Sequence, residues 1–106
     1  MRKIQYTPDA ANKLRLLKEN ITLQYGPQKA NKILRNITNS INLLSFNEFL
    51  GPSVEKMFGI PTNYRYIFTS KNYIFYTIDT NHIHIINIYN EKEDFIWPLF
   101  GLTSDY

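Results

Sequence analysis

The fold is decided by residues 63–90, which read NYRYIFTSKNYIFYTIDTNHIHIINIYN. Runs rich in aromatic and β-branched residues, at 63–69, 73–79 and 82–89, are each typical of a β-strand. The two connections between these runs are only three and two residues long, and such short connections join antiparallel strands through tight turns. The stretch therefore predicts a three-stranded antiparallel meander.

The last of the three runs is apolar on both faces. Ile83 and Ile85 point to one side of the strand, while Ile86 and Ile88 point to the other. An edge strand normally shows a polar face. We therefore predict that this strand is central, and that a further strand at 2–7, if it joins the sheet, lies at the opposite edge.

Two amphipathic helices are predicted before the meander. At the start of the first, Thr7 is suited to cap the helix, Pro8 to occupy its first turn and Asp9 to interact favourably with its dipole. Gly26 and Pro27 then end the first helix and begin the second. Apolar residues recur every three or four positions, as expected for one buried face of each helix: Ala10, Leu14, Leu17, Ile21, Ala30, Ile33, Leu34, Ile37, Ile41 and Leu44.

The order of these elements predicts a single α+β domain over residues 1–106, with the topology β-α-α-β-β-β. A helical hairpin packs on a twisted, mainly antiparallel sheet, because each apolar helix face needs a surface to cover. At 106 residues the chain is long enough for one hydrophobic core. Residues 45–61, which contain two glycines and two prolines, are expected to form a loop.

The composition excludes several classes of protein. The chain has no cysteine, so it has neither a disulfide framework nor a thiolate metal site. No apolar run is long enough to cross a membrane, and the N-terminal residues become polar too soon for a secretory signal. We therefore expect a cytoplasmic protein that does not associate with a membrane.

Charged side chains are unevenly distributed. Residues 1–47 carry eight basic and two acidic side chains, whereas residues 48–106 carry four basic and seven acidic ones. Such asymmetry fits an anionic partner for the first half of the chain. It fits equally well two amphipathic helices whose outer faces are solvated by lysine and arginine.

Few residues have the spacing of a known catalytic or metal site. His82 and His84 point to the same side of a strand, but no further ligands follow at a suitable spacing, so we expect no metal and no cofactor. No serine lies in a nucleophile-elbow pattern, and no glycine-rich loop is suited to hold a phosphate. Glu91, Glu93 and Asp94 follow the last strand, where we expect solvated carboxylates rather than an acid–base pair.

A different pattern combines basic and aromatic residues in the first two strands of the meander. Tyr64 and Tyr66 share one face of their strand, and Arg65 takes the other. Lys71 lies in the following turn, and Tyr73 begins the next strand. Basic residues among aromatic ones can hold phosphates and stack bases. The tyrosines are equally suited to cross-strand packing under the helices, and both interpretations stay open.

Four segments together resemble the RelE/ParE superfamily, the toxin halves of bacterial type II toxin–antitoxin modules. They are IQYTPDAANKLRLL, YGPQKANKILRNITNSINLLSF, YRYIFTSKNYIFYTI and INIYNEKEDFIWPLFG, which span nearly the whole chain. The resemblance implies a growth-inhibiting toxin of the plasmid-stabilisation type that a cognate antitoxin protein neutralises. It also implies one of two targets, because RelE-like members cleave mRNA on the ribosome whereas ParE-like members inhibit DNA gyrase.

The resemblance favours the ParE-like target slightly. RNA-cleaving members carry an arginine at the position of Tyr73, whereas NYIFY at 72–76 is more similar to the ParE form of this strand. The alternatives are a ribosome-dependent endoribonuclease and a non-toxic relative that only binds its antitoxin. For a nuclease, the candidate catalytic residues are Arg65, Lys71, Tyr73 and Lys92.

The resemblance also implies contacts with an antitoxin or a target. An acidic antitoxin segment is expected across the basic helices. Glu91 and Glu93 on either side of Lys92 would repel an RNA phosphate but suit a protein-binding edge. The tail FIWPLFG is expected to pack back on the core or to meet a partner. The predicted partner- or target-binding residues are Tyr64, Tyr66, Lys13, Lys29, Lys32, Arg35, Glu91, Phe95 and Trp97.

Overall fold

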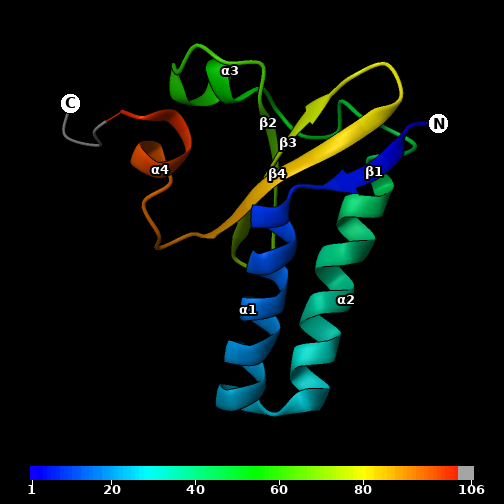
Figure 1. The fold of residues 1–106 in the computed structure, drawn as a ribbon, viewed down its shortest axis with the longest axis vertical. Helices are drawn as coiled ribbons and strands as arrows, with labels where there is room; N and C mark the ends of the chain where they lie inside the picture. The colour runs from blue at the N-terminus through cyan, green and yellow to red at the C-terminus, as the bar shows by residue number, and fades with distance from the viewer. Residues whose placement is uncertain (103–106) are drawn as a thin grey trace.

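The computed structural model describes residues 1–102 and has the predicted order of elements, with two short helices added (Figure 1). The long elements confirm the α+β prediction, with the helical hairpin preceding the meander. The elements are β1 (Lys3–Tyr6), α1 (Pro8–Tyr25), α2 (Pro27–Leu43), α3 (Val54–Phe58), β2 (Arg65–Thr69), β3 (Asn72–Ile78), β4 (His82–Asn90) and α4 (Ile96–Phe100).

The four strands form one sheet in the order β1-β4-β3-β2. β2, β3 and β4 pair antiparallel, as the short turns predicted, and β1 pairs parallel with β4. β4 is therefore central, as its two apolar faces predicted, but Ile88 lies on the helix side with Ile83 and Ile85 instead of sharing a face with Ile86. β1 lies at the edge of the sheet away from β2. The register between β3 and β4 shifts at Phe75 and Tyr76, where the ladder is irregular.

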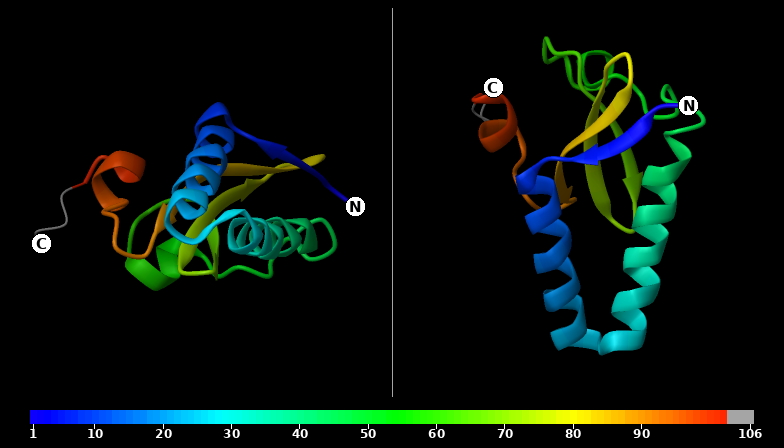
Figure 2. Two further views of the ribbon diagram at one scale, coloured as in Figure 1. Left: turned by 90° about the horizontal axis from the view of Figure 1, so that it is seen from below. Right: turned by 45° about the vertical axis from the view of Figure 1, so that its right-hand side comes forward.

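The helical hairpin begins and turns at the residues expected from the sequence. Thr7 caps α1 by accepting a hydrogen bond from the Ala10 backbone N–H at 3.0 Å, and its hydroxyl donates to the Ile86 carbonyl at 2.7 Å. This second bond ties the start of α1 to the central strand. Gly26 adopts a positive φ of 91°, which glycine accommodates without steric cost, and α2 begins at the next residue, Pro27. Figures 1 and 2 show the α1–α2 turn projecting far beyond the sheet.

One face of the sheet packs against the helices. The side chains there are almost all aliphatic, and most of them are the apolar residues expected from the helical and strand periodicities. This helix-side core consists of Ala10, Ile37, Ile41, Leu44, Ile67, Ile74, Tyr76, Ile83, Ile85 and Ile88.

The opposite face is covered by aromatic rings, which we call the aromatic cluster: Phe58, Tyr64, Tyr66, Tyr73, Phe75, Tyr89, Phe95 and Phe100. Its contacting ring centroids are 5.0 to 6.5 Å apart, and each such pair stabilises by about 0.5–1.5 kcal/mol beyond area burial. The expectation that the strand tyrosines pack under the helices is wrong for Tyr64, Tyr66 and Tyr73, which face away from them. The reason is strand alternation: Ile67, Ile74 and Tyr76 occupy the helix side.

Two short helices not foreseen in the sequence close over the aromatic cluster. α3 contributes Phe58, and the segment around α4 contributes Phe95 and Phe100. Ser53 caps α3 by accepting from the Lys56 backbone N–H at 3.4 Å. At five residues each, α3 and α4 are too short to produce a helical periodicity. The tail therefore packs back on the core through its phenylalanines, while Trp97 stays 61 % exposed.

Tyr76 fixes the long connection between α2 and β2 to the sheet. Its side chain is fully buried, and its hydroxyl donates to the Glu48 carbonyl at 2.8 Å and accepts from the Gly51 N–H at 3.0 Å. Gly51 lies so close to β2 that a Cβ atom there would stand 2.1 Å from the Tyr66 carbonyl oxygen. The loop can take this path only because residue 51 has no side chain.

Replacing Tyr76 with phenylalanine should destabilise the fold. The ring would remain, but a buried N–H and a carbonyl would lose their partner, which costs about 1–3 kcal/mol. In a domain of this size, thermal unfolding should then occur at least about 4 °C lower. The matched control is Tyr25→Phe on the exposed hairpin turn. Equal melting temperatures for the two variants would contradict this role of Tyr76.

Candidate functional site

Strand alternation places two of the candidate catalytic residues on opposite faces of the sheet. Arg65 pairs with Tyr76 across β2 and β3, and Phe68 pairs with Tyr73. Paired residues share a face, so Arg65 lies on the helix side while Tyr73 lies in the aromatic cluster. The structure therefore does not bring these two side chains together.

Arg65 has structural partners on its own side. Its Nε donates to the Gly51 carbonyl at 2.7 Å, and its guanidinium lies 5.2 Å from the centre of the Phe49 ring. These contacts hold the loop that Tyr76 also binds. Arg65 is thus half-buried and engaged with the fold rather than presented to an incoming phosphate.

Tyr73 and Tyr66 are neighbours within the aromatic cluster, with ring centroids 5.7 Å apart. Tyr73 also contacts the rings of Phe68 at 4.8 Å and Phe95 at 5.2 Å. Burial raises the pKa of the Tyr66 hydroxyl, and the Tyr73 hydroxyl beside it raises that pKa further. A phenol with a raised pKa is a poorer general base near neutral pH.

Lys71 and Lys92 do lie at the same end of the sheet. Lys71 occupies the β2–β3 turn with φ 64°, and its carbonyl accepts from the Glu91 N–H at 2.9 Å. Lys92 follows directly, and all three residues are exposed. The structure therefore brings two candidate cations together, with the predicted partner residue Glu91 beside them.

Glu93 closes the turn that follows β4. It accepts from the Asn90 N–H at 2.9 Å through one carboxylate oxygen and from Lys13 Nζ at 2.8 Å through the other. Lys13 also lies 4.6 Å from the centre of the Tyr89 ring. Partial burial opposes ionisation of Glu93, but the hydrogen bonds from Lys13 and Asn90 outweigh it and lower the pKa of this carboxyl. Glu93 thus joins α1 to the end of the sheet.

The predicted basic surface divides into two parts. Lys13 on α1 is engaged by Glu93, whereas Lys29, Lys32 and Arg35 are exposed on α2. None of these three forms an ion pair with another residue in the part of the chain that the structure describes. Lys29 Nζ lies 4.2 Å from the centre of the Tyr25 ring, next to the hairpin turn. α2 therefore presents the basic side chains that are available to an acidic partner.

The remaining predicted contact residues differ in exposure. Tyr64, Tyr66 and Phe95 belong to the aromatic cluster, with Phe95 almost fully buried. Trp97 is largely exposed on α4, which packs against the aromatic cluster, whereas α2 packs against the opposite face of the sheet. The structure does not gather all the predicted contact residues into one surface.

An apolar groove runs between the end of α2 and the edge strand β2, a feature that the sequence did not reveal. Its volume is about 320 Å³, and its walls include Leu43, Leu50 and Phe68, each about half exposed. β2 is the last strand of the sheet on this side, and a groove beside a sheet edge suits an extended or helical peptide. The sequence signal was weak: Leu43 simply falls outside the apolar stripe of its helix.

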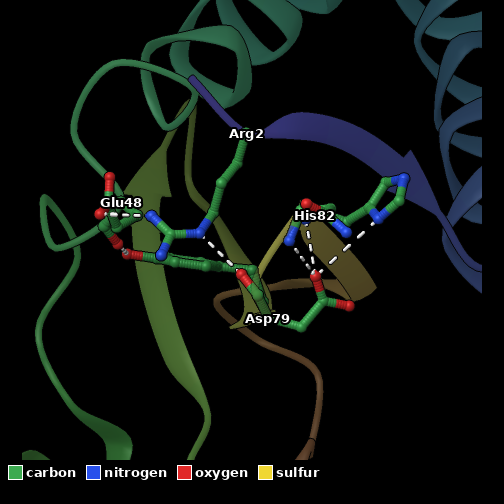
Figure 3. A network of polar contacts seen from close by, with 6 residues as sticks. Arg2, Glu48, Asp79 and His82 are labelled. Atoms are coloured by element: carbon green, nitrogen blue, oxygen red, sulfur yellow. Dashed lines mark hydrogen bonds and ion pairs between the residues drawn. The ribbon is translucent and has the colours of Figure 1, made fainter.

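A polar cluster lies at the opposite end of the sheet, in the β3–β4 turn (Figure 3). One carboxylate oxygen of Asp79 hydrogen-bonds to His84 Nε2 at 2.5 Å, and the other accepts from the backbone N–H groups of Asn81 and His82. The bond to His84, together with these two backbone bonds, lowers the pKa of the Asp79 carboxyl to about 2. Arg2 links this turn to the α2–α3 connection, because it donates to the Asp79 carbonyl and pairs with Glu48.

A helical hairpin between the edge strand β1 and an antiparallel meander is the architecture that the resemblance to RelE/ParE superfamily toxins implied. Residues 4–95 match the family model described as the ParE toxin of the type II toxin–antitoxin system, parDE. The chain therefore belongs to the ParE toxin family of type II toxin–antitoxin systems. Among curated proteins, none matches the sequence significantly.

Two solved structures show the same fold. A chain of the chromosomal ParDE toxin–antitoxin system from P. aeruginosa is 20 % identical with a TM-score of 0.71, and the match covers 85 % of this chain and 96 % of that one. A chain of the E. coli DinJ-YafQ toxin–antitoxin complex is 19 % identical with a TM-score of 0.56, covering 94 % and 98 %. No helix within residues 1–102 is long and apolar enough to span a membrane.

Proposed function

We propose that this toxin inhibits growth by binding DNA gyrase, without cleaving RNA, and that a cognate antitoxin holds it inactive. The observation that carries the proposal is the separation of Arg65 from Tyr73 by the sheet itself. The proposal places the protein in the cytoplasm, where gyrase acts, within a module of the plasmid-stabilisation type.

RNA cleavage makes demands that this arrangement does not meet. The reaction needs a group to take the proton from the 2′-hydroxyl and cations to stabilise the charge that develops on the phosphate. The tyrosine nearest to Tyr73 has a raised pKa, and the neighbours of Tyr73 itself are aromatic rings. Arg65 is on the other face, bound to Gly51.

The charges at the end of the sheet that contains the β2–β3 turn also argue against RNA cleavage. Lys71 precedes Tyr73 by two residues and Lys92 lies at the same end of the sheet, but Glu91 lies directly beside both lysines. A carboxylate beside an approaching phosphate repels it, by about 1 kcal/mol at 4 Å in water and more where water is excluded. A protein target has no uniform negative charge, so the mixed charges at this end do not oppose its binding.

One observation favours the endoribonuclease alternative: Lys71, Lys92 and Tyr73 all lie near one end of the sheet. A nuclease built only on these residues would bind RNA against the exposed turn at that end. This alternative makes a different prediction for the purified protein, which the following experiment separates. A non-toxic relative that only binds its antitoxin would neither inhibit gyrase nor cleave mRNA.

The purified protein should inhibit supercoiling by gyrase in proportion to its concentration and leave mRNA intact during translation on ribosomes. Both assays should use the same protein preparation, with and without the cognate antitoxin. Antitoxin should restore supercoiling, because it binds the toxin and keeps it from inhibiting gyrase. Cleaved mRNA with unaffected supercoiling would overturn the gyrase proposal, and inactivity in both assays would favour the non-toxic alternative.

We further propose that the antitoxin places an acidic segment along α2. The helix carries three exposed basic side chains that form no ion pair within residues 1–102: Lys29, Lys32 and Arg35. The apolar groove at the end of the same helix offers room for hydrophobic side chains of the antitoxin. Charge and apolar surface on one helix thus fit an amphipathic acidic segment.

Reversing the three α2 charges, with Lys29→Glu, Lys32→Glu and Arg35→Glu, should weaken antitoxin binding at least about tenfold, or about 1.4 kcal/mol. The loss should shrink as salt rises, since screening weakens exposed charge pairs. The matched control reverses Lys56, Lys71 and Lys92, which changes the net charge equally but lies off α2. Equal losses in both variants would mean that only overall charge matters and would rule out the α2 site.

A further inference from the structure

The turn between β3 and β4 brings together three side chains that are common metal ligands. Asp79, His82 and His84 each offer one ligand atom, and these atoms lie within 4.8 Å of one another. His82 and His84 are at positions i and i+2 of β4, so they project from the same face of the strand. The sequence showed the two histidines, but the turn supplies the carboxylate.

The three side chains need only small movements to reach the ligand spacing around one zinc ion. Bonds of about 2.0–2.2 Å in a tetrahedral site place neighbouring ligand atoms roughly 3.3 Å apart. His82 Nδ1 lies 3.8 Å from one Asp79 oxygen, and His84 Nε2 lies 2.5 Å from the other. An ion would therefore bring His82 slightly closer to the carboxylate and move His84 slightly further away.

The side chains have the freedom to make these movements. Asp79 is exposed, and His82 and His84 are about one third exposed, so no core contact has to break. The backbone of the turn is fixed, because Asp79 Oδ1 accepts the N–H groups of Asn81 and His82. In addition, Arg2 donates to the Asp79 carbonyl at 2.7 Å. The ligands thus extend from a well-defined turn.

The charges around the turn are compatible with a bound cation. Two basic side chains, those of Arg2 and Lys3, belong to residues next to this turn: Arg2 donates to the Asp79 carbonyl, and Lys3 is the register neighbour of His82 across β1 and β4. Arg2 is paired with Glu48, which offsets its positive charge (Figure 3). Lys3 is exposed and can extend into solvent.

We propose that Asp79, His82 and His84 form a binding site for a divalent transition-metal ion such as Zn²⁺. Two imidazoles and one carboxylate are a ligand set that zinc accepts, with the fourth position open to water or to a ligand from a partner. The site lies at the end of β3 and β4 remote from Lys71 and Lys92, so it is separate from these candidate nuclease residues. A bound ion would stabilise the folded chain, because the unfolded chain does not hold the three ligands together.

The chain offers an unusually clear test, because it contains two histidines and no cysteine. Untagged full-length protein should be titrated with ZnCl₂ by calorimetry, while the imidazole signals of both histidines are followed by NMR. We expect one ion per chain, simultaneous shifts of both imidazoles and a higher melting temperature. The absence of binding would overturn the proposal.

Variants distinguish a metal site from a simple Asp79–His84 ion pair. His82→Ala and His84→Ala should each weaken Zn²⁺ binding at least about tenfold, since even the loss of an outer partner of a ligand costs 10–100-fold. Glu91→Gln, an exposed carboxylate at the other end of the sheet, is the control and should bind normally. Melting curves in chelator verify that each variant is folded. Unchanged affinity in a folded His82→Ala variant would contradict the three-ligand site.

Discussion

Burial of both faces of the sheet is the constraint on which the rest of the structure depends. Helices α1 and α2 cover one face with aliphatic side chains, and the aromatic cluster with α3 and α4 covers the other. Because side chains alternate along a strand, every residue of β2 and β3 is assigned to one of two separate environments. This assignment, more than any single contact, separates Arg65 from Tyr73 and leaves no common nuclease site for them.

Because both faces of the sheet are buried, the surfaces available for binding lie outside the sheet. The α1–α2 turn projects from the body (Figure 2), and the first half of α2 displays exposed basic side chains. The groove beside β2 adds apolar surface, and Trp97 adds an exposed ring beside the aromatic cluster. Surfaces of this kind bind proteins through charge and apolar contact. They fit the proposal that this ParE family toxin binds a protein target and a protein antitoxin.

Much of this architecture could be predicted from short-range patterns in the sequence. The two short turns predicted the meander, and the isoleucines of β4 predicted that this strand is central. Both predictions were possible because each signal depends only on residues close together in the sequence. The helices α3 and α4 were missed because five residues do not show a period. The Lys13–Glu93 and Asp79–His84 pairs were also missed, since they depend on how distant segments or a turn place side chains. Candidate site residues could be named from their chemistry, but their grouping required the register of the strands.

The most direct measurement of the central claim is growth inhibition by a variant that lacks the three candidate nuclease groups near one end of the sheet. Lys71→Asn, Tyr73→Phe and Lys92→Ala should be combined, since asparagine tolerates the positive φ of residue 71 and phenylalanine keeps the packed ring. On induction in cells without antitoxin, the folded variant should arrest growth as the parent does, with mRNA intact in both. Cleaved mRNA in cells expressing the parent, with cleavage and growth arrest both abolished in the variant, would contradict the account.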